Sequence, residues 1–184
     1  ASMDMTGFSA SNLGSQLEMV ARIIERREAL GLKRQIFFVT MGGFDTHSGQ
    51  VTKLPALQSE LARSLKSFYD ATVRLGIEDQ VTTFTASDFG RTLGVNGDGT
   101  DHGWGAHHFV AGGAVNGGQI YGDIPPPEFG HDYDAGRGRL IPQIAVDQYA
   151  ATFGRWFGLT ESNLNDAIPG LKNFDRNVLG SLFR

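Results

Sequence analysis

The stretch QIFFVTMGGFDTHSGQ, residues 35–50, predicts how the first half of the chain folds. Its first seven residues are mostly apolar or β-branched, a pattern typical of a strand covered on both faces in a parallel sheet. Gly42 and Gly43 then allow a sharp turn, after which Asp45 and His47 stand two positions apart. The stretch therefore predicts a strand over residues 36–41 that delivers a carboxylate and an imidazole to the edge of a sheet.

Two amphipathic helices are expected on either side of this strand in the sequence. Ser11 can cap the first helix, and Gly31 stands where a C′ glycine would end it. The second helix is expected over residues 54–75, with Gly76 as its terminator. Apolar residues at helical spacing are Leu13, Leu17, Val20, Ala21 and Ile24 in the first helix, and Leu54, Leu57, Leu61, Leu65, Phe68 and Val73 in the second.

Residues 81–86 (VTTFTA) predict a second strand, which ends at Ser87 and Asp88. A strand, a helix and a strand in this order form a βαβ unit, whose crossover is right-handed in about 98% of cases and whose strands are parallel. In open α/β sheets, ligands bind beyond the carboxyl ends of the strands. Asp45, His47 and Asp88 are therefore expected to lie together at one edge.

A second group of ionisable residues occurs in GTDHGWGAHH, residues 99–108. The chain has no cysteine, so a bound metal would need imidazole or carboxylate ligands. His102 lies among glycines, which permit close approach to an ion and give an imidazole no packing role. Asp101 is a weaker candidate ligand than His102.

Simpler interpretations stay open for these residues. Asp45 would then cap a turn, with His47 a solvated loop residue, as is common for short motifs. In the same way, HHFVAG would be a strand in which His107 or His108 faces the core.

Arg91, in SDFGRT, follows Asp88 by three residues. Its guanidinium can bind a phosphate or sulfate in bidentate fashion, or it can pair with Asp88, which is the commoner arrangement. Arg91 and His107 are the candidate catalytic residues.

Composition excludes some classes of function. The 184 residues carry a formal net charge of −4 and no run of Lys or Arg, which argues against nucleic acid as a partner. No apolar run approaches the ~20 residues of a membrane span. Because the sequence begins with Ala1 rather than Met, an upstream segment removed by processing is left open.

The length fits one α/β domain over residues 1–184, with a region rich in glycine and proline over residues 90–139. Three consecutive prolines predict a rigid surface excursion, in which a solvated polar loop is favoured over a calcium site at His131, Asp132 and Asp134. Residues 146–157 predict a helix with aromatic core residues.

Four motifs in order carry a family resemblance: GGFDTHSGQ, SDFGRT, GTDHGWGAHHFVAGGAVNGGQIYG and RGRLIPQIAVDQYAATFGRWFG. They resemble the family catalogued as domain of unknown function 1501, whose relatives belong to the alkaline phosphatase and sulfatase superfamily. The resemblance implies a three-layer α/β/α sandwich with a mainly parallel sheet, of which this chain is the C-terminal half. It also implies a metal-bearing active site at the carboxyl edge of that sheet.

The resemblance implies a divalent metal, either zinc, manganese or calcium, and a small anionic ester of phosphate or sulfate as substrate. Family members commonly carry a twin-arginine export signal, which implies a periplasmic or secreted location. An upstream segment or another chain would complete the fold. The ligands that the resemblance implies are Asp45, His47, Asp88 and His102, with Asp101 less certain.

Two departures from the superfamily pattern bear on function. Phe89 stands where a histidine usually follows the second aspartate, and the upstream strand that carries the nucleophile is not found. Ser9 and Ser11 precede the first helix, where a capping role is expected. Two hypotheses follow: a metal-dependent hydrolase of phosphate or sulfate esters, incomplete without an upstream half, or a non-catalytic binding or assembly module on the same scaffold.

Overall fold

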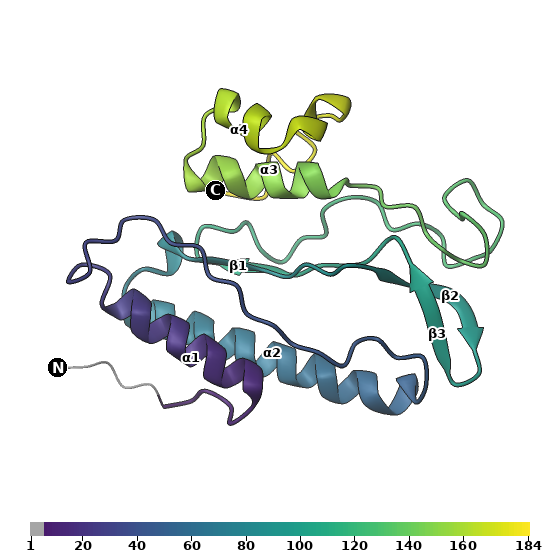
Figure 1. The fold of residues 1–184 in the computed structure, drawn as a ribbon, viewed down its shortest axis with the longest axis horizontal. Helices are drawn as coiled ribbons and strands as arrows, with labels where there is room; N and C mark the ends of the chain where they lie inside the picture. The colour runs from purple at the N-terminus through teal and green to yellow at the C-terminus, as the bar shows by residue number, and fades with distance from the viewer. Residues whose placement is uncertain (1–5) are drawn as a thin grey trace. The chain divides into compact units, whose positions relative to one another are not determined.

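The protein is described from a computed structural model, which describes residues 6–184 (Figure 1). The chain forms two compact units, and it passes between them several times. Unit 1 comprises residues up to 84 together with 96–100 and 110–114, and unit 2 comprises 85–95, 101–109 and 115–184. The elements are α1 (Asn12–Glu25), α2 (Gln50–Arg74), η1 (Glu78–Gln80), β1 (Thr82–Phe84), β2 (Gly90–Asn96), β3 (Gly99–Gly103), β4 (Val110–Gly112), α3 (Val146–Phe157), α4 (Glu161–Ala167) and η2 (Pro169–Asn173).

The predicted three-layer α/β/α sandwich with a mainly parallel sheet is wrong. Within the described chain, the strands form two sheets of two strands each, β1 with β4 and β2 with β3. β1 and β4 are antiparallel, with Thr83 opposite Ala111. β2 and β3 are joined by a turn at Gly97 and Asp98, and so short a connection joins only antiparallel neighbours. The predicted strand at 81–86 exists in shortened form, but its partner is β4.

Residues 36–41 form no strand, contrary to prediction. The side chains of this segment nevertheless alternate: Ile36 and Phe38 are 83% and 90% exposed, whereas Phe37 and Val39 pack against the core of unit 1. The apolar run was interpreted as a strand covered on both faces. In the structure only one face is covered, and no neighbouring strand pairs with the segment.

The first predicted helix is confirmed as α1. Ser11 is its N-cap, and the Ser11 hydroxyl accepts a hydrogen bond from the Gly14 N–H at 2.9 Å. The helix ends at Glu25, with Arg26 as its C-cap, so the prediction that Gly31 ends it is wrong. Gly31, which has a φ of +66°, lies in the turns after the helix. All five residues of the predicted apolar face are buried: Leu13, Leu17, Val20, Ala21 and Ile24.

The second predicted helix is confirmed as α2, which begins at Gln50, four residues earlier than expected. Gly76 ends it as predicted, with a φ of +66°. The Ile77 N–H then donates to the Thr72 carbonyl at 3.1 Å, which is the long bond of a Schellman motif. Phe68 and Ala71 of α2 pack against α1 and so form the core of unit 1.

Unit 2 has its own smaller core. α3 has the predicted bounds and ends at Gly158, which has a φ of +97°. Ala151 of α3, Leu164 of α4 and Leu171 of η2 are fully buried together. The predicted aromatic packing is present in part, since Phe153 is buried and meets Tyr149 edge-on at 4.7 Å between ring centroids.

The helices of the described chain include no candidate for a membrane span. The longest, α2, has 25 residues and carries basic side chains along its length, such as Lys53, Arg63 and Lys66. A spanning helix needs about 20 predominantly apolar residues. The expectation of no membrane span is therefore confirmed for these residues.

A carboxylate and three hydroxyls join the start of α1 to α2. One oxygen of Glu60 accepts hydrogen bonds from Ser9 at 2.9 Å, from Ser64 at 2.7 Å and from Ser11. These bonds favour the ionised carboxylate, with that from Ser11 the strongest influence, and they lower the pKa of Glu60 to about 2. Arg63, 3.5 Å away, acts in the same direction.

The lowered pKa of Glu60 predicts a specific loss of stability in acid. The ordinary pKa is 4.5 and the folded pKa is about 2, so the contribution of Glu60 is fully present above pH 4.5 and is lost as the pH falls through 2. We expect Glu60→Gln to flatten the fall in the free energy of unfolding between these two pH values. Urea unfolding at a series of pH values measures how the free energy of unfolding depends on pH in each protein.

Glu28→Gln is the control, because the Glu28 side chain is 88% exposed. It should reproduce the wild-type pH dependence. A Glu60→Gln variant whose stability falls as steeply as that of the wild type would contradict this account of the cluster.

Candidate metal centre

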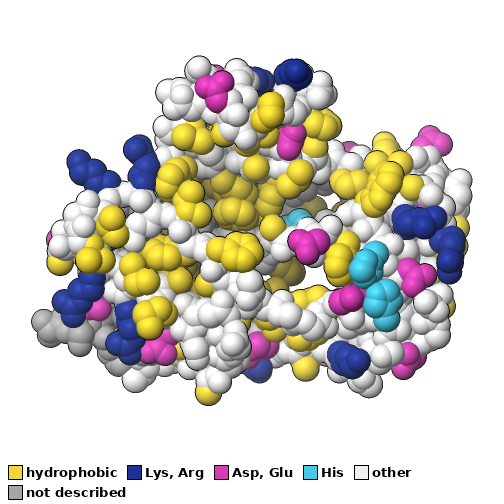
Figure 2. All heavy atoms as spheres, in the orientation of Figure 1, with side chains coloured by type: hydrophobic (Ala, Val, Ile, Leu, Met, Phe, Trp, Pro, Cys, Tyr) yellow, Lys and Arg dark blue, Asp and Glu magenta, His cyan; other side chains and the backbone are white. Residues whose placement is uncertain are grey.

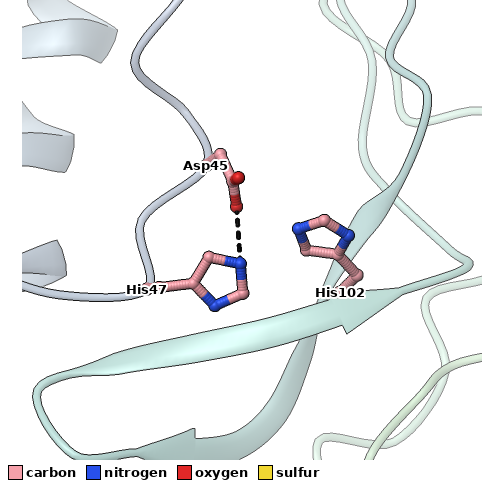
Figure 3. Close-up of side chains that lie close together, drawn as sticks. All are labelled: Asp45, His47 and His102. Atoms are coloured by element: carbon pink, nitrogen blue, oxygen red, sulfur yellow. Dashed lines mark ion pairs between the residues drawn. The ribbon is translucent and has the colours of Figure 1, made fainter.

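The side chains of Asp45 and His47 lie in contact in the loop before α2. The Nε2 of His47 lies 3.0 Å from the Oδ1 of Asp45, and the two side chains are 48% and 51% exposed (Figure 3). Thr46 between them is 2% exposed, so its side chain points into the protein. The loop thus presents a carboxylate and an imidazole on one side and anchors itself with the residue between them.

Gln50, the first residue of α2, binds the buried Thr46 side chain. Its side-chain carbonyl oxygen accepts hydrogen bonds from the Thr46 hydroxyl at 2.9 Å and from the Thr100 hydroxyl at 2.8 Å. The Thr100 N–H also donates to the Thr46 carbonyl at 3.2 Å, and the Gln50 N–H donates to the Asp98 carbonyl at 3.1 Å. All four residues belong to unit 1, and these bonds tie the loop to the start of β3.

Gly99 lets the loop and the strand approach closely. A Cβ atom at this position would run into the backbone carbonyls of Thr46 and His47. Only glycine, which lacks that atom, fits there without displacing the loop.

His102 belongs to the same strand, two residues after Thr100. Alternate residues of a strand point to the same face. His102 and Thr100 are therefore on the same face of β3, and Thr100 contacts the loop. One ligand atom each of Asp45, His47 and His102 then lies within 4.8 Å of the others, and all three residues are exposed (Figure 3). In residues 6–184, no other group of three or more such side chains meets this condition.

An aromatic ring fixes the plane of the His102 imidazole. Phe89 stacks on it, with ring centroids 3.8 Å apart and an interplanar angle of 6°. The guanidinium carbon of Arg91 lies over the same Phe89 ring, 5.8 Å from its centroid. Because all three residues belong to unit 2, the stack restricts the imidazole from within that unit.

The donor set fits a borderline divalent cation. Two imidazoles and one carboxylate are typical ligands of zinc and also suit manganese. Two ligands on one zinc ion lie no more than about 4.2 Å apart, twice a bond of about 2.1 Å. Exposed side chains can close the remaining few tenths of an ångström by small rotations. Three protein ligands with an open position are the pattern of catalytic rather than structural zinc.

The other predicted site residues lie outside this group of three. Asp88 is exposed in the segment between β1 and β2, and the parallel sheet that was expected to bring it to Asp45 does not exist. The Oδ2 of Asp101 is 3.7 Å from the Nη2 of Arg137. His107 is exposed between β3 and β4.

Neither His107 nor His108 lies in a strand, since β4 begins at Val110. Partial burial, and secondarily the neighbouring His107, lower the pKa of His108. Its Nδ1 is 3.3 Å from the Thr85 hydroxyl. Both imidazoles are nevertheless exposed at the surface, between β3 and β4.

Asp134 organises the loop after the proline run. Its two carboxylate oxygens accept three backbone N–H groups, from Gly130 at 2.9 Å and from Gly136 and Gly138 at 2.8 Å each. These bonds, led by that from Gly130, lower the pKa of Asp134. The carboxylate is thus engaged by its own loop.

Sequence reasoning missed two features that position the candidate ligands. Phe89 was considered only as a residue that cannot bind metal, although its ring holds His102. Thr46 and Thr100, joined through Gln50, were not considered at all. The available signal was a threonine between Asp45 and His47, a residue type that often turns inward to bond a neighbouring polar group.

Fold and site together describe a mixed α and β protein with a candidate metal-binding group on an exposed loop and strand. The family described as "Protein of unknown function (DUF1501)" matches residues 1–167, so the chain belongs to this family, as the motifs predicted. No curated protein and no solved structure matches the chain. The family description assigns no chemistry, so function must be argued from the site.

The Gln50 network predicts a measurable contribution to stability. Gln50→Ala removes the side-chain oxygen that accepts a hydrogen bond from each of two buried hydroxyls, and a buried group left unsatisfied costs about 1–3 kcal/mol. We expect the free energy of unfolding, measured in urea, to fall by about 1–3 kcal/mol, since water can reach part of the gap.

Gln58→Ala, at an exposed position of the same helix, is the matched control and should change stability by less than about 0.5 kcal/mol. If the two variants unfolded at the same urea concentration, the network would have no special role.

Proposed function

We propose that Asp45, His47 and His102 bind one divalent cation, zinc or manganese, and that the site hydrolyses phosphate or sulfate esters. The observation that carries the proposal is the convergence of their three ligand atoms within 4.8 Å at an exposed position. Calcium fits this set less well, because calcium prefers six to eight oxygen ligands and two of the three donors are imidazoles.

Exposure of the site supports a catalytic role. A bound cation of this kind supplies Lewis-acid polarisation of an ester oxygen, or a bound water of lowered pKa. Three protein ligands leave room for water and a substrate oxygen. Asp45 and His47 orient each other through their 3.0 Å contact, and Phe89 holds the His102 ring by stacking.

Arg91 and His107 are the proposed catalytic partners. The guanidinium of Arg91 can bind an anion in bidentate fashion, and its place over the Phe89 ring keeps it beside the residue that stacks on His102. It would attract the anionic ester. His107, exposed five residues after His102, is a candidate proton carrier, because the imidazole ring can both accept and donate a proton.

Phe89 favours a second candidate function, a metal-bound binding or assembly module. In the superfamily that the motifs resemble, a histidine at this position is a metal ligand. Phe89 cannot replace that ligand, and its ring covers one face of His102. A site with a single cation binds anions without necessarily turning them over, since fold and ligand set do not fix the reaction.

Further proposals rest on the motif resemblance alone. These are membership of the alkaline phosphatase and sulfatase superfamily, an extracytoplasmic location, and a further segment or chain that completes the site. The two small antiparallel sheets give the superfamily assignment no support. The metal and activity measurements below do not depend on it.

Metal binding tests the three ligands directly. We expect wild-type protein dialysed against zinc or manganese to retain about one ion per chain, and to gain thermal stability by RT ln(1 + [L]/Kd). His47→Ala and His102→Ala should each lose most of the bound metal and the thermal shift. Elemental analysis and thermal unfolding with and without metal measure both.

His107→Ala is the matched control and should bind metal normally. The motifs imply that Asp88 is also a ligand, whereas the structure places it outside the group of Asp45, His47 and His102. Asp88→Asn should therefore also retain the ion. Unchanged metal content in both His47→Ala and His102→Ala would leave Asp45 and His47 as a surface ion pair.

Hydrolysis tests the reaction. We expect slow, metal-dependent turnover of 4-nitrophenyl phosphate or sulfate, because a nucleophile positioned in line has not been identified and orientation alone is worth about 7–11 kcal/mol of barrier. Asp45→Asn should reduce kcat/KM at least tenfold, and Arg91→Ala should mainly raise KM. Initial rates with zinc and with manganese measure these effects.

Wild-type protein that binds one equivalent of metal yet turns over neither ester would contradict the hydrolase proposal. It would favour the binding module, for which the same esters would act as ligands without being cleaved.

A further inference from the structure

Trp104 is a large aromatic residue at the surface of unit 2. It follows β3 directly, two residues after the candidate ligand His102, and it is 64% exposed. Figure 2 shows histidine and hydrophobic side chains side by side at the surface of the displayed face. A single exposed aromatic residue is common in proteins and needs no explanation by itself. The position of Trp104 on a firmly packed backbone is what indicates a role.

The backbone on both sides of Trp104 is packed against β2. A Cβ atom added to Gly103 would lie 3.1 Å from the backbone carbonyl of Arg91. A Cβ atom added to Gly90 would run into the backbone carbonyl of Gly105. Glycine allows both close approaches because it lacks that atom. The chain is therefore held before and after Trp104, which fixes the point from which the indole projects.

The same two approaches show which residues of β2 and β3 lie opposite each other. The two strands are antiparallel neighbours. Gly103 lies beside the peptide bond that follows Arg91, and Gly105 lies beside Gly90. Trp104, between the two glycines Gly103 and Gly105, is therefore opposite Arg91. Residues directly opposite in an antiparallel pair have their side chains on the same face.

This face carries groups for both parts of an ester. Alternate residues of an extended chain share a face, so His102 is on the face of Trp104. Phe89 stacks on His102, and the guanidinium carbon of Arg91 lies 5.8 Å from the centroid of the Phe89 ring. All four residues belong to unit 2. A candidate metal ligand, a guanidinium that can bind an anion and a flat indole thus occur together.

We propose that Trp104 binds the organic part of the ester, and that this part is an aromatic ring stacked on the indole. The inference rests on the proposed function, because the metal at His102 and the guanidinium of Arg91 hold the phosphate or sulfate group. The Cα atoms of His102 and Trp104 are at most about 7 Å apart, since two residues of extended chain span no more. A ring joined to the anionic group through one or two atoms therefore reaches the indole.

An aromatic ring fits this place better than an alkyl group or a cationic group. An alkyl group gains only from the removal of apolar area from water, whereas an aromatic ring also gains from stacking on the indole. A cation is attracted to the face of an indole, but here the positive charge of Arg91, the residue opposite, repels it.

Quenching of tryptophan fluorescence tests the stacking. The chain has two tryptophans, so in Trp156→Phe all tryptophan emission comes from Trp104. Trp156 stacks on Phe183, and phenylalanine keeps a ring at that contact. With zinc bound, we expect benzyl phosphate to quench the emission and to bind at least about fivefold more tightly than ethyl phosphate, which lacks the ring. Choline phosphate, with a cation in place of the ring, should bind like ethyl phosphate.

Trp104→Ala should remove the preference for the ring. In calorimetric titrations of the zinc-loaded protein, benzyl and ethyl phosphate should then bind within about twofold of each other, and the zinc content should equal that of wild type. The wild-type protein should show the full preference, which also controls for the Trp156→Phe change. Phe174→Ala, at another exposed aromatic residue of unit 2, is the matched control and should keep the preference.

Two failures of this experiment are distinguishable. Equal binding of benzyl and ethyl phosphate to the zinc-loaded wild type, tighter binding of choline phosphate than of benzyl phosphate, or a preference that survives Trp104→Ala would each overturn the inference and leave the metal site standing. A wild-type protein that retains no zinc and no manganese would overturn the proposed function and the inference with it.

Discussion

The amide oxygen of Gln50 is the acceptor on which the geometry of the candidate site depends. It receives the hydroxyls of Thr46 and Thr100, which are 2% and 6% exposed. Buried hydroxyls need partners, so the contact between the loop, the first turn of α2 and the start of β3 stabilises all three. Gly99 removes the one Cβ atom that would keep them apart. Two candidate ligands flank Thr46, and the third follows Thr100 along its strand.

Elements encoded by local signals could be predicted from the sequence. Ser11 as a cap, Gly76 as a terminator and the helix over 146–157 depend on residues a few positions apart, and all three are present in the structure. Strand pairing depends on distant partners. The strand near residues 81–86 was expected beside residues 36–41, but its hydrogen bonds go to β4, which no local pattern identified as a partner.

The candidate site was predictable where residue chemistry sufficed. Asp45 and His47 were expected together at the carboxyl edge of a parallel sheet, and His102 was expected as an imidazole among glycines. The structure brings the ligand atoms of all three together, although the described residues form no such sheet. Asp88 was added through a parallel sheet, and that reason disappeared with the sheet. The role of Phe89 could not be predicted from the sequence. Its ring stacks on His102 because the fold brings the two rings face to face, and the distance between the two residues in the sequence does not reveal that contact.

Gly43 lies between the extended residues 35–41 and the loop of the candidate site. Its φ of +98° is open to glycine, and an added Cβ would lie 3.0 Å from a methyl carbon of Leu57 on α2. The chain therefore turns from residues 35–41 into the Asp45 loop against the helix that Gln50 begins. A change in the position of α2 would move the turn and the anchor of Thr46 together. The carboxylate of Asp45 and the imidazole of His47 are thus held from both ends of one short loop, while His102 depends on β3 and on the ring of Phe89.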